Sequence, residues 1–246
     1  MLFTVTYDGN GATGGAAPVD STSYESGDVV TTLANTGGLT KPGATFGYWN
    51  TAPDGTGTDL DPGNTFPNTG NVTLYAQWLI TDGLTGGGRT IHFSFSYHER
   101  LRTTAANPFG PEPARTNAVI AACEDDYNRM SGWFASNAVT GIKVQVTPCS
   151  NGPYWFGSAS SATLRLKPAG ASHCLSPVYF RYLLIAEVSE IFMSRQNAGR
   201  FQDNDEASKS ECLSRFLSAA SWTSTGPSIC HFAPTMARPQ PRTDRG

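Results

Sequence analysis

Alternation of apolar and polar residues at both ends of the first 80 residues constrains the fold more than any other feature. Apolar side chains occupy every second position in residues 3–8 and again in residues 72–78. A period of two is typical of a strand with one buried face. Residues 28–33 and 45–50 read as two further strands, and Asp8–Gly11 supplies residues that accept a positive φ in a turn. The sequence therefore predicts a small sheet domain at residues 1–80.

The distribution of charge also changes near residue 80. Residues 1–80 carry one lysine and seven acidic residues, whereas the rest of the chain is more basic than acidic and the whole chain has a net charge of -3. This break supports a domain boundary, and 246 residues fit two domains. The acidic balance argues against a dedicated nucleic-acid binder, which would show a basic stripe.

The segments of the first domain resemble a known family. They read FTVTYDGNGATGG, LTKPGATFGYWNTAPDGTGT and NVTLYAQW. Together they resemble the Listeria–Bacteroides repeat of the internalin B type over residues 3–78. One departure is Tyr48, which stands between Gly47 and Trp49 where the family usually has Gly directly before Trp. We expect this change to alter local packing of the strand and not the fold.

The resemblance implies a small β-grasp module of bacterial surface or secreted proteins, which acts as a spacer or interaction unit. The residues agree, since the module has no His, no Cys and one Lys and so lacks a nucleophile–base set. Asp54, Asp59 and Asp61 do not have the spacing of an EF-hand loop. We therefore expect solvated turn acids there, with a metal site as the alternative.

The remainder of the chain predicts a flexible glycine-rich linker at residues 81–89 and an α+β domain at residues 90–221. Residues 91–98 and 142–146 alternate as strands, and residues 154–156 and 163–166 suggest one or two more. Apolar residues recur at helical spacing in residues 115–135. Ser176 and Pro177 are an N-cap and first residue typical of a helix that runs to about Asn197, and a last helix is expected at residues 208–220.

The helix after Pro177 carries acids on an apolar face. Glu187 has leucines and an isoleucine three and four residues away, and Glu190 lies on the same side. A carboxylate in such surroundings needs a partner or must keep its proton. Glu211 supplies another acid on the expected next helix.

This layout weakly resembles gluzincin-type zinc metallopeptidases, in which a helix with His-Glu-x-x-His is followed by a helix with a Glu ligand. The resemblance implies Glu187 as the base and Glu211 as the third ligand. Ala186 and Glu190 occupy both histidine positions, which removes a tetrahedral zinc site of the usual kind. A degenerate zincin-like domain without a standard catalytic site is the most that the resemblance implies.

Three hypotheses follow for these acids. In the leading one, Glu187, Glu190 and Glu211 form a structural network with Arg215 or Arg181. In the second, they bind a hard divalent cation through oxygen atoms. In the third, residual hydrolysis uses a metal held by the acids together with His173 or His98. The expected cofactor is therefore none, with a divalent metal ion as the alternative.

Location and partners follow from the repeat. We expect an exported or cell-surface protein whose partners are protein or cell-surface ligands. Residues 1–6 do not form a signal peptide, so the chain either starts within a longer protein or is cytoplasmic. No transmembrane stretch is visible. Five cysteines leave at least one thiol without an internal disulfide partner, and the Pro- and Arg-rich residues 222–246 are expected to be a disordered tail.

Overall fold

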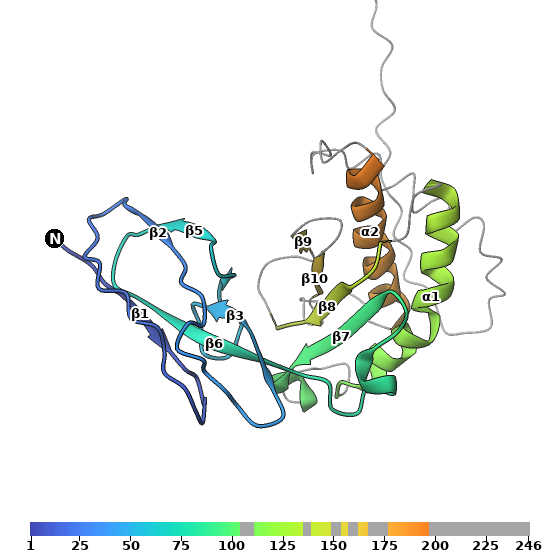
Figure 1. Cartoon of the computed structure of the whole chain (residues 1–246), viewed down its shortest axis with the longest axis horizontal. Coiled ribbons are helices and arrows are strands. Elements are labelled where there is room, and N and C mark those ends of the chain that lie inside the picture. Colours follow the sequence, from blue (N-terminus) through green and yellow to red (C-terminus); the bar gives the residue numbers. More distant parts are fainter. Residues whose placement is uncertain (104–110, 135–138, 149–153, 157–161, 167–176, 197–246) are drawn as a thin grey trace, which may run out of the picture.

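The computed structural model describes residues 1–103, 111–134, 139–148, 154–156, 162–166 and 177–196. In these residues the chain is α+β, as the sequence predicts. Figure 1 shows two modules side by side: residues 1–80, the repeat module, consist of strands and turns, and the described residues after 80, the helical module, place two helices beside a sheet. The expected helix at 208–220 and the tail at 222–246 lie outside the described residues.

The repeat module is built around its last strand, β6 (Val72–Ile80). β1 (Val5–Asp8) pairs with the first half of β6 in parallel, and β3 (Thr45–Asn50) pairs with β6 in the antiparallel sense. Three short strands complete it: β4 (Asp59–Leu60) next to β3, and β2 (Val29–Thr31) with β5 (Thr65–Pro67) in a separate two-stranded sheet. The buried core comprises Val5, Tyr7, Val30, Leu39, Trp49, Leu60, Leu74, Ala76 and Trp78.

The family departure at Tyr48 coincides with an irregularity in β3. Phe46 pairs with Trp78, Tyr48 with Gln77 and Trp49 with Ala76, so Gly47 is an extra residue in the strand. A Cβ on Gly47 would lie 2.8 Å from the Leu79 side chain, so a larger residue there would require Leu79 to move. The bulge keeps Phe46 and Trp49 on the core face and turns Tyr48 to the opposite face.

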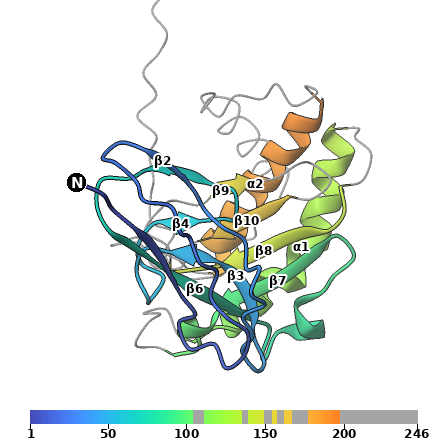
Figure 2. The same cartoon turned by 60° about the vertical axis from the view of Figure 1, so that its left-hand side comes forward.

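The helical module alternates strands and helices. β7 (Phe93–His98) leads through η2 (Glu99–Arg102) to α1 (Ala114–Phe134), and β8 (Ile142–Val146) returns parallel to β7. β10 (Thr163–Leu166) pairs with β8 in parallel and with β9 (Tyr154–Phe156) in the antiparallel sense. The helix α2 (Pro177–Gln196) follows. Both helices pack against each other on one side of the strands (Figures 1 and 2). The core combines Phe93, Phe95, Tyr97, Val119, Cys123, Tyr127, Met130, Val144, Leu164, Leu184, Val188, Ile191 and Phe192.

The two modules share one sheet. Its order is β4-β3-β6-β7-β8-β10-β9, with β1 beside β6, and the bridge between modules is Leu79 and Ile80 of β6 paired with His98 and Tyr97 of β7. Between these strands the glycines of residues 81–89 predict a flexible linker, but the structure shows a folded turn. Residues Thr85–Gly88 form the short helix η1, Leu84 is buried, and Asn117 of α1 bonds both Thr85 N and Gly83 O.

Among the described residues, no helix has the length and apolar character needed to cross a membrane.

Candidate functional site: a polar junction between the modules

One face of the shared sheet is polar yet largely buried. Ile80 of β6 lies opposite Tyr97 of β7, and both belong to the helical core. Trp78 and Ala76 of the repeat core lie on the same face of β6 as Ile80, so both apolar cores are on one face of the sheet. The residues between them point to the other face. On that second face, Tyr48, Gln77 and Asn50 of the repeat module are fully buried, as is Arg165 of the helical module. We call this face the polar junction; its members are Tyr48, Asn50, Asp59, Gln77, His98, Gln145 and Arg165.

Arg165 of β10 joins the modules across the polar junction. Its guanidinium donates to Asp61 at 3.0 and 2.6 Å, and its Nε donates to Gln145 Oε1 at 3.0 Å. Asp59 Oδ2 lies 3.6 Å from the same guanidinium, whose carbon is 3.8 Å from the centre of the Tyr48 ring. β10 and β4 are far apart in the strand order, so this contact requires the sheet to curve with the polar junction inside.

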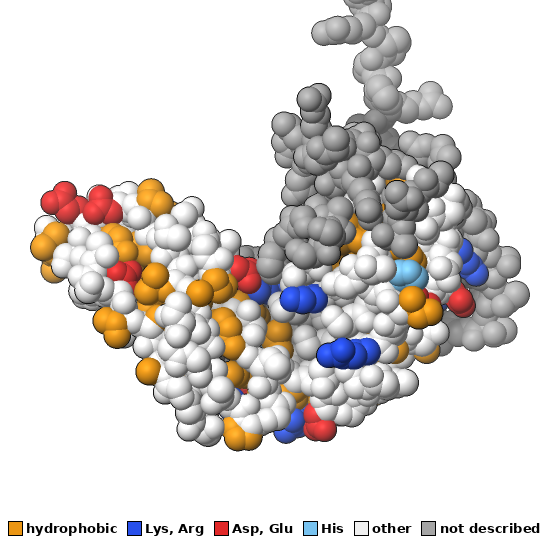
Figure 3. Space-filling model, viewed as in Figure 1, with side chains coloured by type: hydrophobic (Ala, Val, Ile, Leu, Met, Phe, Trp, Pro, Cys, Tyr) orange, Lys and Arg blue, Asp and Glu red, His pale blue; other side chains and the backbone are white. Residues whose placement is uncertain are grey.

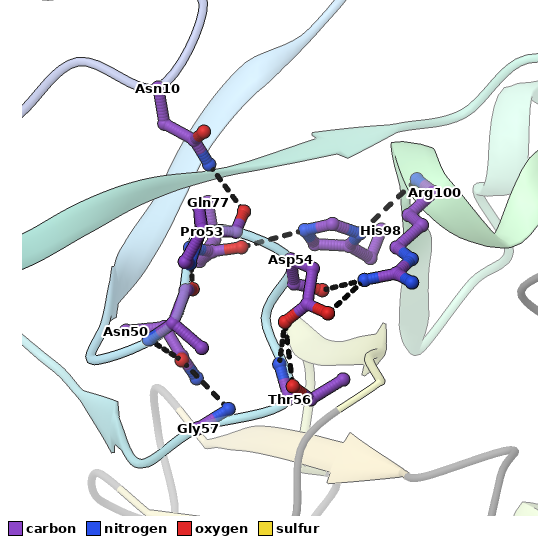
Figure 4. Close-up of polar contacts among 10 residues, drawn as sticks. Asn10, Asn50, Pro53, Asp54, Thr56, Gly57, Gln77, His98 and Arg100 are labelled. Carbon is purple, nitrogen blue, oxygen red and sulfur yellow. Dashed lines mark hydrogen bonds and ion pairs between the residues drawn. The ribbon is translucent and has the colours of Figure 1, made fainter.

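Gln77 and His98 form a second connection, drawn in Figure 4. The Gln77 amide donates to Ala52 O at 3.2 Å and Tyr75 O at 3.0 Å, which fixes its oxygen toward His98 Nε2 at 2.9 Å. His98 Nδ1 accepts a hydrogen bond from Arg100 N at 3.2 Å and so caps η2. The neutral imidazole with its proton on Nε2 satisfies both contacts.

Residues 51–58, the β3–β4 loop, close over this part of the polar junction. Asn50 holds the loop, since its side-chain oxygen accepts from Ala52 N at 2.8 Å and Gly57 N at 3.0 Å, and its amide donates to Asp59 at 2.7 Å. Gly55 has a φ of 75°, and a Cβ there would come within 2.9 Å of the Pro148 side chain. The loop therefore fits closely between β6 and the helical module.

Two ion pairs connect η2 to the repeat module. Arg100 pairs with Asp54 of the β3–β4 loop, and Lys41 Nζ lies 2.5 Å from Glu99 Oε1. The Thr56 hydroxyl, and then Arg100, lower the pKa of Asp54 to about 2. Burial, with the nearby charges of Arg100 and Lys41, lowers the pKa of His98 to about 4. Figure 3 shows acidic and basic side chains meeting where the modules join.

The acids of the repeat module therefore differ from expectation. The sequence predicts Asp54, Asp59 and Asp61 as solvated turn acids, but the structure places Asp59 in the buried polar junction and pairs Asp54 and Asp61 with arginines. The physical reason is the second module, which brings Arg100 and Arg165 against turns that the first 80 residues alone leave in water. No signal within the repeat could have shown this.

The acids predicted on the helix after Pro177 are only partly described. Glu187 and Glu190 of α2 are both buried, at 7% and 4% exposure. Arg181, proposed as a partner, binds Asp126 of α1 with two contacts of 2.5 Å. Glu211 and His173 lie outside the described residues.

His98 does not support the third hypothesis for these acids. Its side chain lies on the polar junction, whereas α2 packs on the opposite, apolar face of the same sheet. The sheet therefore lies between His98 and Glu187, so the two side chains cannot bind the same metal ion. In the part of the chain that the structure describes, no group of three His, Cys, Asp or Glu side chains is placed to hold a metal ion.

Two other reactive groups are held in structural contacts. His92 Nδ1 lies 2.6 Å from Glu124 Oε2, and its ring stacks on Tyr127 at 3.7 Å. Cys123 is buried in the helical core, and burial raises the pKa of its thiol to about 12, which makes it a poor nucleophile. Neither group joins the polar junction.

The polar junction is the feature that sequence reasoning missed. Ser94, Ser96 and His98 alternate with the aromatic residues of β7, which indicates a polar sheet face but not what covers it. Chemically, the arrangement is a set of mutually bonded donors and acceptors that fixes one module against the other.

Comparison with known proteins bears on the repeat module alone. Residues 3–77 match the family described as the Listeria-Bacteroides repeat domain, which confirms that resemblance. A protein of Evansella cellulosilytica named as a Gly-rich membrane protein is 43% identical over 79 residues, which are 32% of this chain and 9% of that protein. Another, named as a membrane protein, is 40% identical over 78 residues, 31% of this chain and 11% of that protein.

The chain spans about a tenth of the length of these curated relatives. No solved structure matches it. The comparisons lend no support to the gluzincin resemblance of residues 90–221, which stays a prediction.

Proposed function

We propose that this chain belongs to an exported bacterial cell-surface protein in which the Listeria–Bacteroides repeat is a fixed structural mount for a non-catalytic helical module. The repeat family and the names of the two relatives support the location. The polar junction carries the structural part of the proposal, because a mobile spacer has no need of two carboxylates bound to a buried arginine of the next module. On this view, ligands on other proteins or on cell surfaces bind to a rigid two-module unit.

Calorimetry of the full chain tests whether the repeat module is fixed to the helical module. Breaking a buried ion pair is strongly destabilising. In the wild-type protein the intact pair should therefore make the two modules unfold together in one cooperative transition. An Arg165→Met variant should separate the repeat from the helical module and give two transitions. Arg102→Met is the matched control, because Arg102 is exposed and its 3.3 Å ion pair is with the exposed Asp82. Two well-separated transitions in the wild-type protein would reject a fixed contact between the modules.

The location has its own test. Intact cells of the source organism, treated with a protease that does not enter them, should lose the protein as detected with an antibody against the repeat module. A cytoplasmic control protein should survive the same treatment. Full protection of the repeat module in intact cells, with loss after lysis, would reject surface display.

A metal-dependent hydrolase related to zinc metallopeptidases is the second candidate. The observation in its favour is the pair of buried carboxylates, Glu187 and Glu190, on one helix next to an antiparallel edge strand. Dialysis of the purified protein against calcium, manganese or zinc, followed by metal analysis, tests it. Stoichiometric metal together with peptide hydrolysis that disappears in Glu187→Gln would support the hydrolase over the structural role. Absence of bound metal would remove it.

A further inference from the structure

His98 occupies the point where the helical module holds the repeat module. It ends β7, its ring contacts Gln77 of β6, and it caps η2. Both ion pairs that run from η2 to the repeat module, Glu99 with Lys41 and Arg100 with Asp54, begin within two residues of this cap. Leu101 anchors η2 in the helical core, and the hydrogen bond from Arg100 N to His98 Nδ1 caps its first turn, which carries both ion pairs.

The geometry admits only one protonation state of the ring. Nδ1 is the acceptor for a backbone N–H, while Nε2 donates to an amide oxygen whose orientation is fixed by two other hydrogen bonds. A second proton must be placed on Nδ1, where it faces the N–H of Arg100. Two donors then point at each other, and the capping hydrogen bond is lost.

The charges around the ring work in the same direction. Arg100 and Lys41 are cations that disfavour an imidazolium, and Asp54 is the opposing anion. Glu99, the remaining charged group of this cluster, is bound to Lys41, and Asp54 is bound to Arg100. Both carboxylates of this cluster are therefore already engaged by other cations, so among the described residues neither is free to compensate an added proton.

We propose that the polar junction is an acid-sensitive coupling, in which protonation of His98 Nδ1 removes the cap of η2, frees the β3–β4 loop from η2 and so loosens the repeat module against the helical module. This inference rests on the proposed function, in which the modules are fixed to each other at neutral pH. Ile80 and Leu101 remain in the helical core, so the modules stay joined at the β6–β7 pairing while the polar contacts of η2 open. The two modules are then held rigidly at neutral pH and move more freely relative to each other in acid.

The depressed pKa of His98, about 4, sets where the release occurs. Full-length protein is followed from pH 7 to pH 3.5 by small-angle X-ray scattering, by NMR of the His98 ring and the Arg100 amide, and by far-UV circular dichroism. We expect the radius of gyration to rise with a midpoint near pH 4 while the helical signal persists. The His98 ring and the Arg100 amide should titrate with that midpoint.

Two variants make the assignment specific. His98→Asn keeps an acceptor for Arg100 N without a titrating group, so its radius of gyration should stay constant over the same range. His92→Asn, the control, removes a histidine bound to Glu124 outside the polar junction and should keep the wild-type transition.

Each outcome decides the proposal. An equal expansion in His98→Asn, a compact wild-type protein with protonated His98, or titration of His98 near pH 6.5 without change at Arg100 overturns it. If His98→Asn does not fold, the shared midpoint in the wild-type protein decides alone. Independent movement of the modules already at pH 7 contradicts the proposed function instead, which separates the two failures.

Discussion

The repeat module and the helical module solve the same packing problem with different means. The repeat has no helix in residues 1–80, and its aromatic side chains bond to loops as well as filling the core. Trp49 Nε1 donates to Leu33 O at 2.9 Å, and Trp78 Nε1 donates to Asn10 O at 3.0 Å. The helical module buries aliphatic and aromatic residues of two long helices against its strands, and there the Tyr127 hydroxyl donates to Val139 O at 2.6 Å. Both modules therefore bond a loop to a core aromatic side chain, and they differ in what surrounds that side chain: strands and turns in the repeat, and helices packed on strands in the helical module.

The contact between the modules follows neither pattern. Buried polar and charged side chains around Arg165 and His98 make it on one face of the sheet, and on the other face Ile80 and Ala44 of the repeat module pack against the helical core. Polar contacts are directional, and their contribution to the free energy of unfolding falls sharply when one partner changes. We therefore expect substitutions here to act differently from substitutions within either core.

Arg165→Met should have the largest effect. It removes a guanidinium that is 1% exposed and leaves the Asp59 and Asp61 carboxylates without their cation. A broken buried pair of this kind costs about 3–5 kcal/mol of unfolding free energy. Urea unfolding of the variant and of Arg102→Met measures the difference. A loss below about 1 kcal/mol in Arg165→Met would show that the polar junction contributes no more than a surface ion pair.

The pH dependence of stability should be the next largest effect. The pKa of His98 is about 4 in the folded protein and 6.5 in an unstructured peptide, so the unfolded chain binds the extra proton first as pH falls. Stability contributed by neutral His98 is complete above pH 6.5, declines as pH falls toward 4, and changes no further below it. The difference corresponds to about 3 kcal/mol. Urea unfolding at several pH values checks this.

His98→Asn is the reference for that measurement, because carboxylates of the chain also titrate in acid. The slope between pH 6.5 and pH 4 should be smaller in the variant than in the wild-type protein. Equal slopes would assign the acid sensitivity to other groups.

Asn10→Gly tests the turn contacts of the repeat. Asn10 has a φ of 46°, and its amide donates to Pro53 O at 2.7 Å and Ala76 O at 2.8 Å. Glycine keeps the backbone conformation and removes both hydrogen bonds, which should cost about 1–2 kcal/mol. Asn10→Ala adds the strain of a positive φ and should be less stable than Asn10→Gly in thermal unfolding. The reverse order would show that the turn relaxes away from this conformation.

Arg100→Gln should have the smallest effect on global stability. Arg100 and Asp54 are about two-fifths exposed, so solvent screens their ion pair and its loss should cost below about 1 kcal/mol. The pKa of Asp54 should rise toward its ordinary value while the Thr56 hydrogen bond remains. NMR titration of Asp54 and urea unfolding measure both results. A loss as large as that of Arg165→Met would place the main connection at η2.

The sequence by itself determined the elements and the nature of the repeat. Alternation in residues 3–8 and 72–78 corresponds to β1 and β6, and the helices expected at 115–135 and from Pro177 to about Asn197 end within one or two residues of α1 and α2. These predictions succeed because side-chain periodicity is a local property, set by the pitch of a strand or helix. The short strands β4 and β5 were not predicted, since they lie among Gly, Asp, Pro and Asn residues that indicate turns.

Only the tertiary structure decided how the modules meet. Arg165 and Asp61 are 104 residues apart, and nothing local to either residue indicates the other. The pairing of β6 with β7 and the curvature of the sheet bring them together, and they convert turn acids and a strand histidine into one buried polar junction. Burial is a property of what covers a side chain, so a sequence that fixes the face of each residue still leaves open whether that face meets water or another module.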